Sequence, residues 1–238
     1  GGIGINARRC WLRAEKMGLG RIIVINKMDH ENLDPPALLA ELREAFGERL
    51  IPANLPNGHG ADFSAVVPTL SLPDDIPGDL ADEAQEVHEA LMEAVIEADD
   101  DILERYLGGE EISADTLAGV VAKAIATSTV VPVLYTSAEK GVGVEELMDF
   151  LAGSIASPEG PINRTIYKGR EGDETIEKSS DSPLAAQVFK IMTDDYVGKI
   201  SFVRVFSGEI KGDSNVYNPK TGKSEKVKEL FSTQGKEQ

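Results

Sequence analysis

Hydrophobic positions in the first two thirds of the chain form short continuous runs and longer helix-like patterns. Two runs, at residues 22–25 and 130–134, are wholly apolar and contain several β-branched side chains. Such runs are typical of strands buried on both faces of a parallel sheet. Apolar residues spaced three or four apart predict helices at residues 7–19, 35–47 and 143–155. Strands that alternate with helices predict a doubly wound α/β fold with a parallel sheet.

About a hundred residues separate the two apolar runs, which is more than one crossover between parallel strands needs. We therefore expect residues 1–157 to form the α/β unit, with a mainly helical insertion at about residues 50–128. Two prolines and repeated Gly and Asn in residues 50–67 predict a strand and a turn. One long helix is predicted from Asp79 to Leu107, and it ends at a pair of glycines.

The predicted long helix has an apolar face and an acidic face. The apolar positions are Leu80, Ala84, Val87, Leu91, Ala94, Ala98 and Ile102. The acidic positions are Asp82, Glu86, Glu89, Glu93 and Glu97. Two interpretations of the acidic stripe remain open, a solvated face over a packed one and a docking surface for a basic protein.

Beyond residues 157–161, which are rich in Pro and Gly and predict a linker, the hydrophobic period becomes two. Residues 168–182 predict a loop or an irregular hairpin. Short antiparallel strands are predicted at residues 184–192, 199–208, 214–219 and 223–231. These strands are too few to close a barrel, so residues 158–238 are expected to form the first part of an antiparallel β-barrel domain.

Most of the net charge of −17 lies in one segment. The segment from Asp74 to Asp115 contains sixteen Asp and Glu residues but only one Lys or Arg residue, Arg105. This segment favours a basic protein partner, while the nearly neutral remainder still permits a surface that contacts RNA.

The remaining composition excludes several classes of protein. A single cysteine, Cys10, cannot form an intrachain disulfide, and three scattered histidines give no metal-ligand spacing, so no metal site and no catalytic residue are assigned. The chain has no run of eighteen apolar residues and no signal-peptide core. We expect a cytoplasmic protein without a membrane partner.

Polar residues follow both predicted strands, and the carboxyl ends of parallel strands are where such sheets bind ligands. The two segments are Asn26 to Asp29 and Ser137 to Glu139. One carboxylate, Asp29, can accept both NH donors on the pairing edge of guanine, where adenine has an acceptor and no amino group.

The neighbouring groups of these two segments suit the same base. The side-chain amide of Asn26 can bond the base and nearby loops, and the stem of Lys27 can lie along the base plane. The backbone NH of Ala138 can donate to the guanine carbonyl oxygen, with Ser137 fixing that loop. No GxxxxGKS or GxxxxGKT phosphate loop occurs in the sequence.

Four segments together resemble bacterial elongation factor G, or an elongation factor G-like paralogue. They are RAEKMGLGRIIVINKMDHEN, LPNGHGADFSAVV, TSAEKGVGVEELMDFL and SPLAAQVFKIMTDDYVGKISFVRVFSGEIKGDSNVYN. The resemblance implies the C-terminal half of a GTPase-type α/β domain, an insertion and an incomplete β-barrel. It implies that GTP or GDP binds at Asn26, Lys27, Met28, Asp29, Ser137, Ala138 and Glu139. In the complete protein of the family, called the parent protein below, magnesium accompanies the nucleotide. Glu139 departs from the family, which has an apolar or basic residue there.

The resemblance also implies partners and an activity for the parent protein. The ribosome is the expected partner of a monomeric protein, with small-subunit RNA facing the β domain and the stalk protein facing the acidic insertion. The parent couples GTP hydrolysis to movement of transfer RNA and messenger RNA, whereas this chain, without a phosphate loop, is not expected to hydrolyse GTP. The alternatives are a fragment of a ribosome-protection or release-factor GTPase, and a non-catalytic module that binds the ribosome or its stalk.

Overall fold

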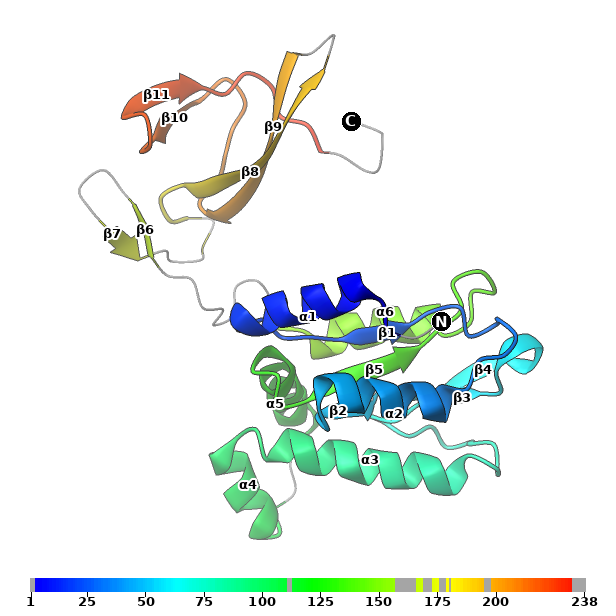
Figure 1. Ribbon diagram of the computed structural model, residues 1–238. Helices are drawn as coiled ribbons and strands as arrows, with labels where there is room; N and C mark the ends of the chain where they lie inside the picture. The colour runs from blue at the N-terminus through cyan, green and yellow to red at the C-terminus, as the bar shows by residue number, and fades with distance from the viewer. Residues whose placement is uncertain are drawn as a thin grey trace. The chain divides into compact units, whose positions relative to one another are not determined.

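The computed structural model describes residues 3–110, 113–156, 166–168, 173–175, 179, 181–194 and 198–232. The chain divides into two compact units, Gly1–Ser157 and Pro158–Gln238. Figure 1 shows helices and strands mixed in the first unit and strands in the second. None of the helices in the described ranges is long and apolar enough to cross a membrane.

A three-stranded parallel sheet forms the centre of the first unit. Its order is β1 (Ile23–Ile25), β5 (Val131–Tyr135) and β2 (Leu50–Pro52). Every residue of β5 is buried, as the apolar run predicted. Val24 of β1, in contrast, is 44% exposed, so the prediction that this strand is buried on both faces was wrong. The reason is that β1 lies at the edge of the described sheet.

The strand β2 lies within the range that the sequence assigned to the insertion. It nevertheless pairs with β5 in parallel, with Leu50 opposite Val131. Leu50 is fully buried, which explains why this short apolar segment belongs to the sheet. The segment between the sheet strands β2 and β5 therefore comprises residues 53–130.

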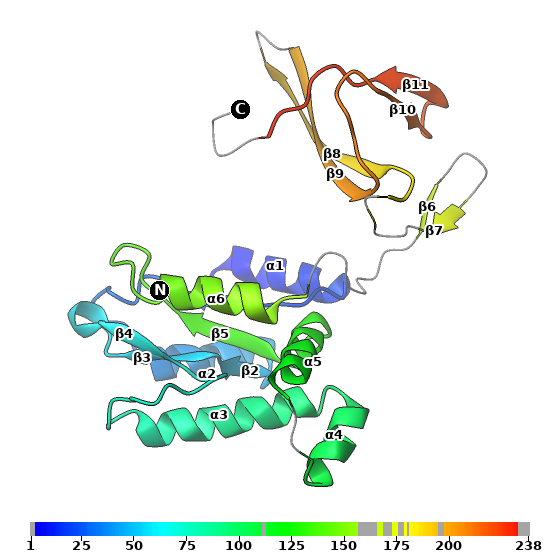
Figure 2. The same cartoon turned by 180° about the vertical axis from the view of Figure 1, so that it is seen from behind.

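Four helices precede, connect or follow the sheet strands, and the helical spacing predicted three of them but not the one at residues 114–126. They are α1 (Ile5–Lys16), α2 (Pro35–Phe46), α5 (Ala114–Ala126) and α6 (Val144–Ser154). The start of α2 is well defined, because the side chain of Asp34 accepts from the backbone N–H of Ala37 at 3.0 Å and Pro35 follows directly. In both views α1 and α6 lie above β5, with α2 below it (Figures 1 and 2).

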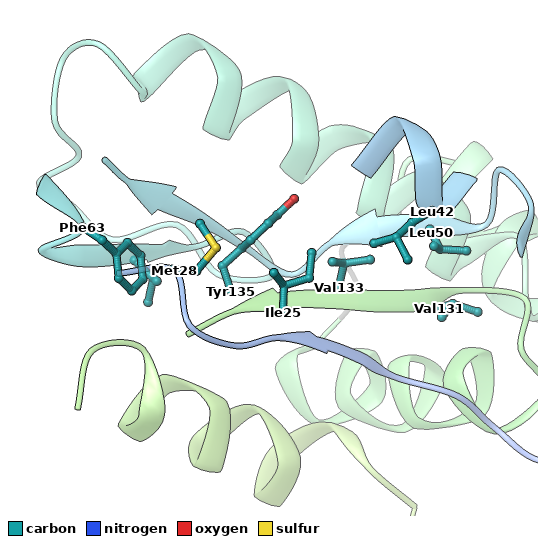
Figure 3. Close-up of a cluster of buried hydrophobic side chains, with 9 residues drawn as sticks. Ile25, Met28, Leu42, Leu50, Phe63, Val131, Val133 and Tyr135 are labelled. Atoms are coloured by element: carbon teal, nitrogen blue, oxygen red, sulfur yellow. The ribbon is translucent and has the colours of Figure 1, made fainter. Parts of the chain in front are cut away.

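One cluster of buried side chains joins this sheet to the loops at its carboxyl edge. Figure 3 shows eight labelled members: Ile25, Met28, Leu42, Leu50, Phe63, Val131, Val133 and Tyr135. Met28 and Phe63, which lie outside the sheet strands, are 0% and 1% exposed. Full burial of such side chains contributes about 1.5–3 kcal/mol each. The core therefore extends into the loop that follows β1, which contains Met28, and anchors that loop.

The segment from residue 53 to 130 contains more strand than the sequence predicted. A hairpin of β3 (Asn54–Asn57) and β4 (Ala65–Pro68) encloses a short 3-10 helix, η1 (Gly60–Asp62). Two helices follow, α3 (Ala81–Ile96) and α4 (Asp100–Leu107). The prediction of one continuous helix from Asp79 to Leu107 was therefore wrong.

The break between α3 and α4 has a local cause at Asp99. This residue has an extended backbone (φ −143°, ψ 109°), and its carboxylate accepts from the N–H of Ile102 at 3.4 Å, which caps α4. The same carboxylate pairs with Lys123 of α5 at 2.7 Å. These contacts lower the pKa of Asp99, and the hydrogen bond to Lys123 is the largest cause.

The two faces of α3 follow the predicted pattern. Leu91, Val95 and Ile96 are buried in one cluster with residues of α5, and Ala84 is buried in another with Leu55 and Val67 of the β3–β4 hairpin. The acidic stripe is exposed at Asp82, Glu86, Glu89, Glu93 and Glu97. Figure 2 shows α3 at the lower edge of the first unit, with one side turned away from the sheet.

The described part of the second unit contains antiparallel hairpins, as the period of two predicted. The pairs are β6 (Ile166–Lys168) with β7 (Asp173–Thr175), β8 (Ala185–Asp194) with β9 (Gly198–Ser207), and β10 (Asn215–Asn218) with β11 (Lys223–Lys226). The predicted linker at residues 157–161, and part of the turn predicted at residues 194–196, lie outside the described residues. That these strands form an incomplete β-barrel stays a prediction.

Candidate nucleotide-binding site

The two polar segments singled out in the sequence lie side by side at the carboxyl edge of the parallel sheet. Ile25, the last residue of β1, pairs with Tyr135, the last residue of β5. Beyond them, the N–H of Thr136 donates to Ile25 O at 2.8 Å and the N–H of Met28 donates to Thr136 O at 3.1 Å. The pairing of the strands thus continues into the two loops.

Asn26 joins the two loops through its side-chain oxygen. This oxygen accepts from the N–H of Lys27 at 2.8 Å, from the N–H of Ala138 at 2.9 Å and from Oγ1 of Thr136 at 3.5 Å. These three donors fix the orientation of the amide. The Nδ2 group is then what Asn26 can offer to an acceptor on a ligand.

Asp29 is the second link between the loops. One of its carboxylate oxygens accepts a short hydrogen bond from the hydroxyl of Ser137. This bond is the main cause of a lowered pKa for Asp29, and partial burial opposes it. Asp29 is therefore a fixed, ionised carboxylate at the edge of the site.

Backbone conformation separates the side chains of Lys27 and Met28. Lys27 has a positive φ of 67°, which is uncommon for a residue with a side chain and turns the loop sharply. Its side chain is exposed, whereas that of Met28 enters the buried cluster. Among the predicted site residues, Met28 therefore presents only its backbone to the loop surface.

The loop after β5 returns tightly to the start of α6. The N–H of Ser137 donates to Val142 O at 2.8 Å, and Gly143 precedes the helix with a φ of 73°. A Cβ atom at Gly143 would lie 2.7 Å from Tyr135 O, so this position requires glycine. Ala138 and Glu139 are exposed in this loop, and the N–H of Ala138 donates to the side-chain oxygen of Asn26.

Sequence reasoning missed Asn54, which supports the end of β5. Its side chain is buried and bonds both backbone groups of Tyr135, donating from Nδ2 to Tyr135 O at 3.2 Å and accepting from Tyr135 N–H at 2.7 Å. The Tyr135 side chain is buried as well, which raises its pKa to about 12. An isolated Asn within the apolar segment LIPANL was the available signal.

Sequence reasoning also missed Lys140, whose ammonium group contacts three backbone carbonyls of residues 60–63. No pattern in the sequence connects these positions. Among the described residues, no group of three His, Cys, Asp or Glu side chains could hold a metal ion.

A parallel sheet whose two loops are bonded to each other at its carboxyl edge is the arrangement of an α/β nucleotide-binding domain. The comparison with known families identifies which kind of nucleotide-binding domain this is. The chain belongs to the elongation factor Tu GTP binding domain family, whose model matches residues 1–157. Membership of this family of translational GTPases implies that the domain binds guanine nucleotides.

A solved structure is similar to nearly the whole chain. It is the crystal structure of a protein from Thermus thermophilus, with 25% sequence identity and a TM-score of 0.80. The match covers 99% of this chain and 34% of that protein. The chain thus spans about a third of the length of this relative.

Proposed function

We propose that the chain supplies the guanine-recognition part of a ribosome-associated translational GTPase that resembles elongation factor G. One observation carries the proposal. Asn26 and Asp29 are each hydrogen-bonded to the loop after β5, so a carboxylate and an amide are held together at the ligand-binding edge of the sheet. The family of residues 1–157 makes a guanine nucleotide the matching ligand.

In this proposal Asp29 reads the pairing edge of the base. Its ionised carboxylate accepts from N1–H and from the 2-amino group of guanine. Adenine has an acceptor at N1 and no 2-amino group, so the same carboxylate repels it. Ser137 orients Asp29 through the hydrogen bond between them.

The remaining groups complete the contact with the base. The Nδ2 group of Asn26 donates to N7, because the oxygen of that amide already accepts from the loops. The N–H of Ala138 is shared between Asn26 and the guanine carbonyl oxygen. The stem of Lys27 covers one face of the base, and Met28 contributes backbone. Glu139 lies at the exposed tip beside the base.

The proposal concerns base recognition and assigns no catalytic residue. The sequence has no GxxxxGKS or GxxxxGKT phosphate-loop pattern. We therefore derive no step of GTP hydrolysis from this chain. Hydrolysis coupled to movement on the ribosome is proposed for the parent protein only.

The acidic face of α3 supports a proposal about the partner. Glu86, Glu89 and Glu93 are exposed on one helix whose opposite face is buried. Uncompensated charge of one sign on a rigid helix favours association with a basic protein. We propose the ribosomal stalk protein as that partner.

The second unit supports a proposal about RNA. Its hairpins are proposed to be part of a β-barrel, and Lys220, Lys223 and Lys228 are exposed around β10 and β11. Lysine ammonium groups in such positions can contact phosphates of small-subunit RNA. The ribosome would then contact both units of the chain.

The test of base recognition compares GDP with ADP. We expect the full-length protein to bind GDP at least about a hundredfold more tightly than ADP, because ADP leaves the Asp29 carboxylate without donors. Asp29→Ala should abolish this preference in isothermal titration calorimetry. Glu31→Ala, at an exposed acid two residues away, is the matched control and should preserve it. Equal GDP preference in the wild type and Asp29→Ala would refute the proposal.

A further inference from the structure

The side chain of Lys140 connects the loop after β5 to a turn eighty residues earlier in the chain. Its Nζ atom donates to the carbonyl oxygens of Ala61 at 2.9 Å, Gly60 at 3.3 Å and Phe63 at 3.5 Å. An ammonium group has three N–H donors, so three carbonyls match it in number. These carbonyls belong to the short helix η1 and its end, where a cation is favoured.

The same turn is also attached to the loop after β1. The N–H of Gly60 donates to Met28 O at 2.8 Å. Phe63 and Met28 are both buried, and their side chains lie close together in Figure 3. The turn at residues 60–63 is thus a rigid base that is fixed to the first loop, and Lys140 fixes the second loop to it.

The backbone of Lys140 takes part in the contacts of the site itself. Its N–H donates to Oγ of Ser137 at 3.2 Å, and the Ser137 hydroxyl donates to Asp29. A hydroxyl has one hydrogen, so accepting from Lys140 strengthens the bond that it donates to Asp29. The Lys140 charge also contributes to the lowered pKa of Asp29, after the larger effect of Ser137. The position of Lys140 therefore affects Asp29 through a single intervening side chain.

We propose that Lys140 is a positioning residue that sets the selectivity of the site for the 2-amino group of guanine. By holding residues 137–140 against the turn at residues 60–63, it presents the Asp29 carboxylate in one orientation. This inference rests on the proposed function and adds the residue that makes the recognition loop rigid. Lys140 itself contacts backbone and not the base.

Inosine diphosphate provides the selective probe, because its base lacks only the 2-amino group of guanine. We expect the wild-type full-length protein to prefer GDP to inosine diphosphate and Lys140→Met to reduce the ratio of the two affinities about tenfold. Methionine keeps an unbranched apolar stem of similar length and removes the ammonium. Lys16→Met, at an exposed lysine of α1, is the control and should leave the ratio unchanged. A role in general stability would lower both affinities equally and leave the ratio unchanged, which would overturn the inference.

Hydrogen exchange without nucleotide tests the contact independently of binding. We expect the amides of Ser137 and Lys140 to exchange faster in Lys140→Met than in the wild type, and Lys16→Met to match the wild type. Unchanged exchange would overturn the inference even if GDP binds. If the wild type does not bind GDP, the proposed function and the selectivity role both fail. The exchange measurement then still decides whether Lys140 holds the loop.

Discussion

At the scale of single residues, the side chains of Asn26, Asp29 and Ser137 each have a partner in the protein that limits what they can do. The oxygen of Asn26 is used by three donors from the protein, which leaves its NH₂ group for a ligand. Asp29 is held by Ser137, and Ser137 by the backbone of Lys140. Recognition of a base would then need little rearrangement, which favours affinity.

The lowered pKa of Asp29 leads to a prediction about the pH at which its carboxyl group titrates. A carboxyl group whose pKa is depressed in the folded protein stays ionised below the ordinary Asp value of about 3.9, and its contribution is lost only as the pH falls through the depressed value. Ser137→Ala removes the largest cause of the depression. We expect the carboxyl carbon of Asp29 to titrate at a higher pH in Ser137→Ala than in the wild type, as followed by ¹³C NMR. An unchanged or lower titration midpoint would contradict the assigned cause.

Sequence reasoning at this scale proposed site residues that follow a recognisable pattern and missed residues that act through the fold. Asn26, Asp29 and Ser137 follow apolar strands, so their types and places were informative. Asn54 and Lys140 bond backbone groups about eighty residues away, and no local period or spacing records such contacts. Their roles depend on the tertiary structure.

At the scale of elements, the hydrophobic period located most helices and strands but not the division of α3 from α4. Ala98 and Ile102 continue the apolar spacing of α3, so the pattern passes across the break without a signal. The signal was the cap: Asp99 followed by two acidic residues is typical of a helix start. The sharp turn at Lys27 was also not predicted from the sequence, because no glycine marks it.

The acidic face of α3 gives a prediction for this element. Changing Glu86, Glu89 and Glu93 to Lys should weaken binding to ribosomes by at least about tenfold, because it replaces attraction to a basic partner by repulsion. Far-UV circular dichroism should stay unchanged, since all three side chains are exposed. Cosedimentation with ribosomes at two salt concentrations measures the effect.

The matched control makes the same change in net charge at three glutamates outside α3 and α4. Glu31, Glu44 and Glu48 are exposed acids outside α3 and α4. Their triple change to Lys should leave ribosome binding nearly intact. Equal effects of the two triple variants would mean that net charge, and not the α3 face, governs binding.

At the scale of the whole molecule, the chain combines an α/β unit with a unit of antiparallel hairpins. The period of the hydrophobic pattern predicted both the α/β unit and the antiparallel strands, because the spacing of apolar residues along the sequence reflects which faces of an element are buried. The strand β2 was assigned to the insertion because three residues are too few to show a period. The parallel pairing with β5 depends on residues about eighty positions apart.

The most direct test of guanine recognition exchanges the base that the site prefers. Xanthine has a carbonyl where guanine has the 2-amino group, so Asp29→Asn can donate to xanthine where Asp29 accepted from guanine. We would measure the affinities of the full-length protein and of Asp29→Asn for GDP and xanthosine diphosphate by calorimetry. We expect the wild type to prefer GDP and Asp29→Asn to prefer xanthosine diphosphate. A variant that keeps the wild-type preference for GDP would show that Asp29 does not read the base.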